Sequence, residues 1–214
     1  MSARTPATPL ASLLLLMAAA PTALAQTTLT VWMEAPAQVQ AGSSFEVDVF
    51  LRGETDLFDD SPGMAGFNAA GVDQTVTALN EAVVDMSFVS GPDLVAQVFE
   101  PVFDPAGPAL LGGGFFQGVN DPALSPSWQA IPELRMFTYR VDLAPDITGS
   151  MTIVPVNLNA WFTPSSETFG GGIMQDDPGV TLDLQPLTVR VVPTPATVAP
   201  GLALLVIGAR RRRA

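Results

Sequence analysis

Short segments in which apolar and polar residues alternate recur along the chain. The clearest is 45–51 (FEVDVFL), where four apolar side chains share one face and leave Glu46 and Asp48 on the other. Residues 28–34 (TLTVWME) repeat the pattern and leave Trp32 off the apolar face. A period of two is typical of half-buried strands, so the pattern predicts an all-β fold. Further strands are predicted at 83–89, 134–143, 150–158 and 182–191.

Glycine and proline separate these segments. The 18 glycines and 20 prolines predict many turns, and Pro155 and Pro186 indicate edge strands or bulges. Residues 74–82 (QTVTALNEA) are expected to form a short helix, and 100–133, with six prolines and the run 112–114 (GGG), a long irregular excursion. No repeat of fixed period is present, which argues against a solenoid or propeller. The strand pattern favours a single antiparallel β-sandwich over residues 26–192.

The order of the segments resembles that of cohesin-like β-sandwich modules of exported surface proteins. The resemblance covers roughly residues 29–191 and implies a cohesin-like or immunoglobulin-like sandwich. It is carried by Val39, Gly42, Phe45, Val47 and Val49 within VQAGSSFEVDV, by MAGFN at 64–68, by LRMFTYRVDL followed by a turn and TGSMTIV, and by the closing LTVRV.

Charge and composition narrow the function classes. The chain has no cysteine, histidine or lysine, so disulfides and thiolate metal sites are excluded and the usual general base is missing. Between the two terminal segments, four arginines face 21 carboxylates, which gives a formal charge of −17. A body this acidic repels phosphate backbones, so no nucleic-acid partner is predicted.

The N-terminal segment is predicted to be a secretory signal peptide. Arg4 precedes an apolar run and then Ala23, Leu24 and Ala25, a small-residue pattern at which signal peptidase would leave Gln26 as the first residue. Residues 1–25 would then be a signal helix. The alternative is a buried helix of a cytosolic fold.

The C-terminal segment combines a Pro-x-Pro tripeptide, an apolar run at 196–209 and a basic cluster. The tripeptide is Pro193, Thr194 and Pro195, and the cluster is Arg210, Arg211, Arg212 and Arg213. The apolar run has 14 residues, fewer than the ~20 that span a bilayer comfortably, which predicts transient insertion with the arginines on the cytoplasmic side.

Residues 193–214 resemble the PEP-CTERM sorting signal of exported bacterial proteins, which usually has glutamate where this chain has Thr194. The resemblance implies export through the inner membrane, processing by an exosortase-type enzyme and a link to exopolysaccharide at the cell surface or beyond it. A plain C-terminal membrane anchor is the alternative and makes the same topological prediction.

Two acidic turns are candidate calcium sites. Asp59 and Asp60 lie in LFDDSPGM, and Asp176 and Asp177 lie in MQDDPGV. Adjacent carboxylates could supply the oxygen ligands that Ca²⁺ requires. The alternative is structural, because Pro178-Gly179 suits the centre of a type II turn and aspartate caps turns through its own backbone. No other cofactor is predicted.

Aromatic residues supply a second candidate site. Trp128, Trp161 and Phe162 could form platforms for sugar rings, with polar partners nearby, although aromatics in a sandwich more often belong to the core. The glycine runs match no phosphate-loop pattern, and paired carboxylates are the only catalytic groups available, so the chain is predicted not to be an enzyme. The possible polar partners are Asn157, Asn159 and Gln129.

The sequence therefore predicts a secreted or cell-surface structural or adhesive protein of the bacterial envelope or polysaccharide matrix. The alternative is an extracellular carbohydrate-binding module, which calcium could assist.

Overall fold

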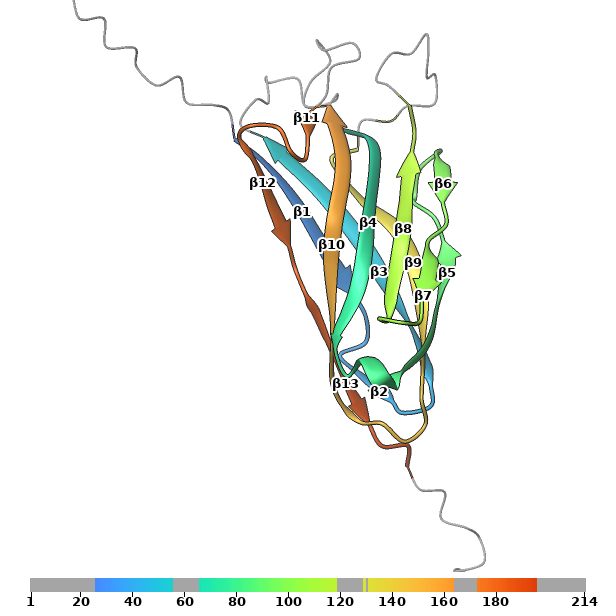
Figure 1. The fold of residues 1–214 in the computed structure, drawn as a ribbon. Coiled ribbons are helices and arrows are strands. Elements are labelled where there is room, and N and C mark those ends of the chain that lie inside the picture. The colour runs from blue at the N-terminus through green and yellow to red at the C-terminus, as the bar shows by residue number, and fades with distance from the viewer. Residues whose placement is uncertain (1–25, 56–65, 119–128, 130, 164–172, 196–214) are drawn as a thin grey trace, which may run out of the picture.

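The computed structural model describes residues 26–55, 66–118, 129, 131–163 and 173–195, and these form two sheets packed face to face (Figure 1). The five-stranded sheet has the order β12-β1-β3-β9-β5. Its strands are β1 (Thr27–Glu34), β3 (Ser44–Thr55), β5 (Val83–Ser90), β9 (Glu133–Leu143) and β12 (Val180–Leu184). The predicted all-β sandwich is confirmed.

The second sheet has eight strands, six of them in the order β2-β13-β10-β4-β8-β6, with β11 added beside β10 and β7 beside β8. A single turn of 3-10 helix, η1 (Asn80–Ala82), follows β4. The strands are β2 (Gln38–Gln40), β4 (Gly66–Ala78), β6 (Gln97–Phe99), β7 (Val102–Asp104), β8 (Ala109–Phe116), β10 (Gly149–Thr163), β11 (Ile173–Met174) and β13 (Leu187–Val192).

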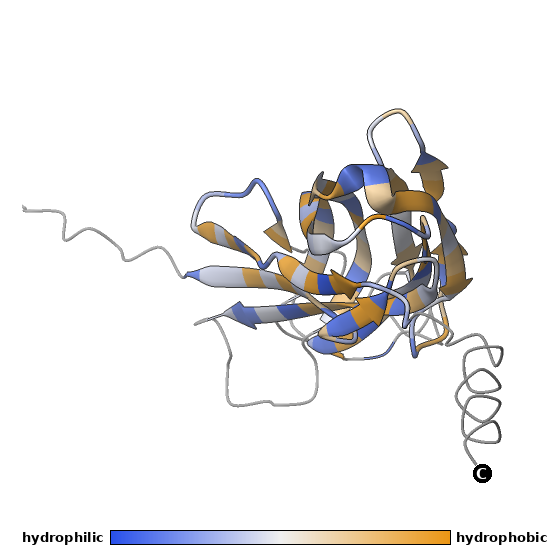
Figure 2. Cartoon of the chain, turned by 90° about the horizontal axis from the view of Figure 1, so that it is seen from below, coloured by the Kyte–Doolittle hydropathy of each residue, from blue (hydrophilic) through white to orange (hydrophobic). Residues whose placement is uncertain are grey.

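The core lies between the sheets and is built from alternate residues of each strand, as the banded colouring along the strands shows (Figure 2). The faces predicted for β1 and β3 are confirmed, since their inward side chains are all buried. On the inner face of the eight-stranded sheet, the Phe67 ring of β4 packs 4.8 Å from that of Phe162 on the neighbouring β10. The inward residues of β1 and β3 are Leu29, Val31, Met33, Phe45, Val47, Val49 and Leu51.

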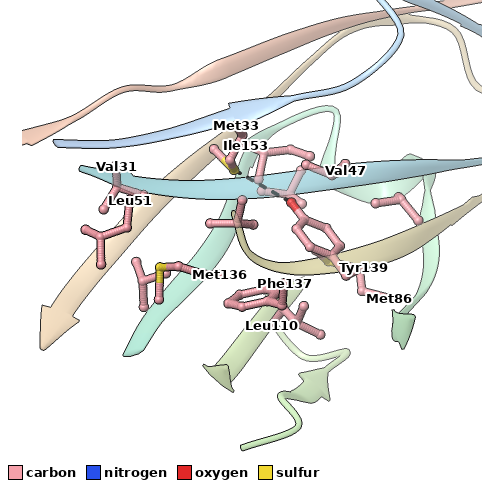
Figure 3. Close-up of a cluster of buried hydrophobic side chains, with 14 of the residues drawn as sticks. Val31, Met33, Val47, Leu51, Met86, Leu110, Met136, Phe137, Tyr139 and Ile153 are labelled. Atoms are coloured by element: carbon pink, nitrogen blue, oxygen red, sulfur yellow. Dashed lines mark hydrogen bonds between the residues drawn. The ribbon is translucent and has the colours of Figure 1, made fainter. Parts of the chain in front are cut away.

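The single tyrosine of the chain, Tyr139 on β9, is fully buried in this core (Figure 3). Its hydroxyl donates to the sulfur of Met33 at 3.8 Å, a weak acceptor. Burial raises the pKa of the phenol well above its usual value because an ionised oxygen here would lose its hydration.

The first and last strands of the body run side by side in the same direction. β12 pairs parallel with β1, and β13 pairs parallel with β2. The chain crosses from the five-stranded to the eight-stranded sheet at Pro36, between β1 and β2, and again at Pro186, between β12 and β13. These two parallel pairings depart from the predicted antiparallel arrangement. Their consequence is that the body begins at one end of the sandwich and finishes at the opposite end (Figure 1).

Three expectations about local structure are wrong. Residues 74–82 form a helix only in their last three positions, the 3-10 turn η1: β4 continues to Ala78, because alternation of inward Gln74 and Val76 with outward threonines lets the strand pair with β10 and β8. The excursion at 100–133 contains β7 and β8. The strand expected at 182–191 is divided at Pro186, which lacks the N–H that a ladder needs. Pro155 of β10 pairs with Gln74 of β4 on one side. It has no partner among the described strands on the other side, because the pairing of β10 with β13 ends at Ile153.

Within the described part of the chain, no helix has the length and apolar character needed to cross a bilayer. The predicted signal helix at 1–25 and the apolar run at 196–209 lie outside the described residues.

Candidate functional site: a groove on the eight-stranded sheet

In the eight-stranded sheet, β10, β4 and β8 lie side by side (Figure 1). Over these three strands the outer face of the sheet contains a groove of about 320 Å³. Its floor consists of residues with little or no side chain. Gly71 of β4 lies across from Gly114 of β8, and Ala69 precedes Gly71 on the same face. Asn159 of β10 flanks Gly71, and Phe99 of β6 flanks Gly114. The floor is therefore bounded by a polar side on β10 and an aromatic side on β6.

Aromatic side chains stand on both sides of Ala69. In the register, Ala69 pairs with Trp161 of β10 on one side and with Phe116 of β8 on the other. Residues paired across strands point to the same face, so both rings rise from the outer surface, about 10 Å apart at two strand spacings. Phe116 is 39% exposed and Phe99 46% exposed, which leaves ring surface open to solvent.

The low floor depends on the close approach of β4 and β8. A Cβ atom at Gly114 would lie 2.3 Å from the carbonyl oxygen of Ala70, a distance that real side chains do not reach. At Gly71 the nearest atom to an added Cβ would be the Gly113 oxygen at 3.4 Å, so a side chain would fit there and project into the groove. Gly114 is thus required by the fold, whereas Gly71 leaves space that the fold does not need.

One carboxylate, Asp73 of β4, lines the groove. Its two oxygens accept hydrogen bonds from the Gly112 N–H at 2.7 Å and from the Asn157 side-chain amide at 3.0 Å. Asn157 has a positive φ of 52° and lies in a β-bulge of β10 between Val156 and Asn159. The bulge turns both asparagines to the surface beside the groove, where amide groups can offer donors and acceptors.

β11 and the residue after it, Gln175, are bound to β10 next to Trp161. Gln175 accepts a hydrogen bond from the Ala160 N–H at 3.0 Å through its side-chain oxygen, and Met174 of β11 pairs directly with Trp161. The row Met174, Trp161, Ala69 and Phe116 thus crosses four strands of the sheet on one face.

The outer face of the five-stranded sheet differs in kind, because it carries three of the four arginines of the body. Arg135 binds Asp48 at 3.4 Å and also Asp93, whose hydrogen bond raises the pKa of the guanidinium further. Arg52 lies 3.2 Å from Glu54, and Arg140 lies 2.8 Å from Asp142. The aromatic pair on this face, Trp32 stacked on Phe50 at 5.1 Å, has the Arg52 guanidinium 5.9 Å from the Trp32 ring.

The structure separates the predicted aromatic platform residues. Trp161 lies next to the groove, paired with Ala69 of its floor, and the predicted polar partners Asn157 and Asn159 line the groove itself. Phe162 is fully buried, so its assignment to an exposed platform is wrong: adjacent residues of a strand point to opposite faces, and Phe162 belongs to the core. Trp128 lies outside the described residues. Gln129 is bound through its backbone to the Gln117 side chain.

The acidic turn at Asp176 and Asp177 has the geometry of a capped turn. Asp177 accepts a hydrogen bond from the Met174 N–H at 2.8 Å through its side chain, and its carbonyl accepts from the Val180 N–H at 3.2 Å. Gly179 has φ of 90°, as the third position of a type II turn requires. Asp59 and Asp60 lie outside the described residues, and among those described no three acidic side chains are grouped as metal ligands.

Sequence reasoning missed most of the groove. Phe99, Phe116 and Asp73 were not singled out, because their common position depends on the pairing of β4, β8 and β6. The available signal was ALLGGGFF at 109–116, a strand-length apolar segment with a glycine run at its centre.

No protein-family model and no curated protein matches this sequence. Solved structures do match it. A type II cohesin domain from the cellulosome of Acetivibrio cellulolyticus is 8% identical, with a TM-score of 0.47 over 77% of this chain and 95% of that one. The C-terminal domain of the Streptococcus pyogenes antigen I/II-family protein AspA is 7% identical, with a TM-score of 0.33 over 76% of this chain and 46% of that one. The assignment to the β-sandwich class rests on the chain's own strand order and buried inner faces.

Proposed function

We propose that this protein is exported and acts outside the cell as a non-enzymatic, adhesive component of a bacterial polysaccharide matrix, binding polysaccharide in the groove of the eight-stranded sheet. The observation on which the proposal rests is the row formed by Trp161, Ala69 and Phe116, in which two aromatic residues flank Ala69, a floor residue of the groove whose side chain is a single methyl group.

Sugar rings suit such a groove. The apolar face of a pyranose ring packs on an aromatic ring, while hydroxyls at the ring edge seek donors and acceptors such as those of Asn157 and Asn159. The separation of Trp161 and Phe116, about 10 Å at two strand spacings, is a length that a disaccharide unit covers. The groove is open along the sheet surface, which suits a polymer better than a small enclosed ligand.

The groove is less suited to hydrolysis. Glycoside hydrolysis ordinarily uses two carboxylates on either side of the bond to be cut. Asp73 is the one carboxylate among the described residues that line the groove, and both of its oxygens accept hydrogen bonds from the chain itself. A binding role therefore accounts for the residues present, whereas a catalytic role leaves one partner missing.

Export is supported by the two terminal segments of the sequence. The secretory pattern that ends at Ala25 and the sorting pattern that begins at Pro193 agree on an extracellular position for the acidic body. β13 ends at Val192, directly before the tripeptide, so the sorting segment follows the sandwich without an intervening linker.

Replacing Trp161 with alanine is expected to weaken binding to a retaining polysaccharide by about tenfold or more, the effect of losing one well-packed aromatic contact. Retardation in native gels containing a panel of neutral and charged polysaccharides measures this. Trp32→Ala is the matched control, since it removes the same ring from the outer face of the other sheet. Equal retardation of wild type and Trp161→Ala, or no retardation by any polysaccharide of the panel, would contradict the proposal.

A groove-filling variant tests the same site without removing an aromatic. Gly71→Val is expected to keep the fold and to lower retardation at least tenfold, because the new side chain occupies the floor. Addition of a calcium chelator distinguishes the calcium-assisted alternative: retardation that is lost with the chelator would place the ligand at a metal site instead of the groove.

The charge of the body predicts a preference among polysaccharides. Because its formal charge is −17, retardation by polyanionic chains is expected to be weak at low salt and to strengthen as salt is raised to about 0.5 M, where the repulsion is screened. Retardation by neutral chains should change little over the same range. Titration of salt in the gel experiment checks both expectations.

A further inference from the structure

The end of the sandwich continues into the tripeptide through a hydrogen-bonded ladder. β13 lies parallel to β2, with the Arg190 N–H donating to the Ala37 carbonyl at 3.0 Å and the Ala41 N–H donating to the Val192 carbonyl at 2.8 Å. Residues 190 and 192 therefore face β2, and Thr194 is the next residue on that side. Strand pairing with β2 ends at Val192, and Pro193 and Pro195 on either side of Thr194 have no N–H to donate.

Thr194 supplies one more hydrogen bond from its side chain. Its hydroxyl donates to the Ala41 carbonyl at 2.6 Å, so Ala41 holds the departing chain through both its N–H and its C=O. Ala41 itself is fixed in place: it is 2% exposed, and the turn around it is closed by the Ser43 N–H donating to the Gln40 carbonyl at 3.1 Å. The acceptor is thus a rigid part of the domain.

We infer that the hydroxyl of Thr194 fastens the Pro193–Pro195 segment to the folded domain, so that this segment becomes accessible to a processing enzyme only when it detaches from Ala41. Enzymes that cut a polypeptide take it as an extended chain with its backbone free of other partners, and in a folded protein such a segment must first open locally. The inference is independent of polysaccharide binding and depends only on the end of β13.

The residue type at this position decides whether the contact forms. Threonine and serine carry a hydroxyl that donates, whereas valine has the shape of threonine without a donor. An ionised glutamate, the usual residue in the sorting signal that this segment resembles, accepts hydrogen bonds and cannot donate to a carbonyl. Thr194 therefore forms a hydrogen bond to the Ala41 carbonyl that an ionised glutamate at this position could not form.

The test uses the full chain in detergent micelles and a post-proline endoprotease as a probe of the segment. Cleavage after Pro193 and Pro195 is followed by intact mass. Thr194→Val is expected to be cut about fivefold faster than wild type, the factor by which loss of one net hydrogen bond shifts a local opening equilibrium. Thr194→Ser is expected to match wild type within about twofold, and Thr194→Glu to behave as valine does.

Cleavage after Pro178, elsewhere on the described surface, serves as the internal control and should be equal in all four proteins. Equal rates after Pro193 and Pro195 for wild type and Thr194→Val would overturn the inference, as would a Thr194→Ser rate equal to that of valine. If Thr194→Val also speeds cleavage after Pro178, the substitution acts through general stability and the inference fails. Polysaccharide retardation, measured on the same four proteins, reports separately on the proposed function.

Discussion

Raising the pH above about 10 is expected to unfold the domain and to ionise its single tyrosine in the same step. Tyr139 is fully buried, and burial raises the pKa of its phenol in the folded state above the value in the unfolded chain. The folded state therefore keeps the proton to higher pH. The stabilisation is fully present below the unfolded pKa of about 10 and falls above it, by up to about 1.4 kcal/mol for each pH unit.

The composition makes this step easy to observe. The chain has no lysine or cysteine and one tyrosine, so the tyrosinate absorbance reports on Tyr139 alone. An alkaline titration followed by tyrosinate absorbance and by circular dichroism should give coincident transitions. An exposed phenol ionises with a pKa of about 10. Appearance of tyrosinate near that pH while the dichroism spectrum is unchanged would contradict the expectation.

Tyr139→Phe provides the matched control for the alkaline step. Because the Met33 sulfur, a weak acceptor, is the hydroxyl's one hydrogen-bond partner among the described residues, its removal is expected to change the free energy of unfolding by less than about 1 kcal/mol at neutral pH. The variant should then remain folded to a higher pH than wild type, since it has no buried proton to lose.

Gly114→Ala is expected to lower the free energy of unfolding by about 3 kcal/mol, because an added Cβ would meet the Ala70 carbonyl and force β4 and β8 apart. Gly71→Ala, directly across the ladder, is the control. Its Cβ meets nothing closer than 3.4 Å, and replacing glycine within a strand is expected to be neutral or to stabilise by up to about 1 kcal/mol.

Denaturant unfolding of the two variants checks this pair. Equal effects of Gly114→Ala and Gly71→Ala would mean that the close approach of the two strands does not constrain Gly114. A large loss of unfolding free energy in Gly114→Ala, with little change in Gly71→Ala, would confirm that the fold requires a glycine at position 114 but not at position 71.

Strands whose two faces differ in polarity were predictable from the sequence. β3 and β9 each carry charged outward residues between buried apolar ones. β9 forms close to its predicted bounds, whereas β3 extends beyond the predicted 45–51 to Thr55. The signal is strong there because one face packs in the core while the other carries the ion pairs of Arg135 and Arg140. Local polarity and tertiary position agree in these strands.

β4 and β8 were missed because small or apolar residues dominate their outer faces, on which Asp73 is the one charged side chain. On β4, Ala69 and Gly71 stand where an exposed strand usually has polar side chains, and the polar pattern near Thr75 resembles a helix. β8 contains three consecutive glycines, which weaken any strand prediction. The small residues that weaken the strand pattern in the sequence are the same residues that form the floor of the groove.

The groove itself was only partly predictable. Trp161, Asn157 and Asn159 were singled out from one short segment, but nothing in that segment places Phe99, Phe116 or Asp73 beside it. Those neighbours come from strands distant in sequence, and their position depends on register, including the bulge at Asn157. Alternation alone would have shown that Trp161 and Phe162 point to opposite faces.

The path of the last strand also has a mechanical consequence. The aromatic row lies near the Trp161 end of β10, whereas β13 pairs with the opposite end of β10 and leaves the sandwich beyond Val192. A ligand pulled away from a tethered tail would load β13 along its length, against β10 on one side and β2 on the other. Ladder bonds lie across the strands, so they would bear this load together in shear instead of opening one at a time.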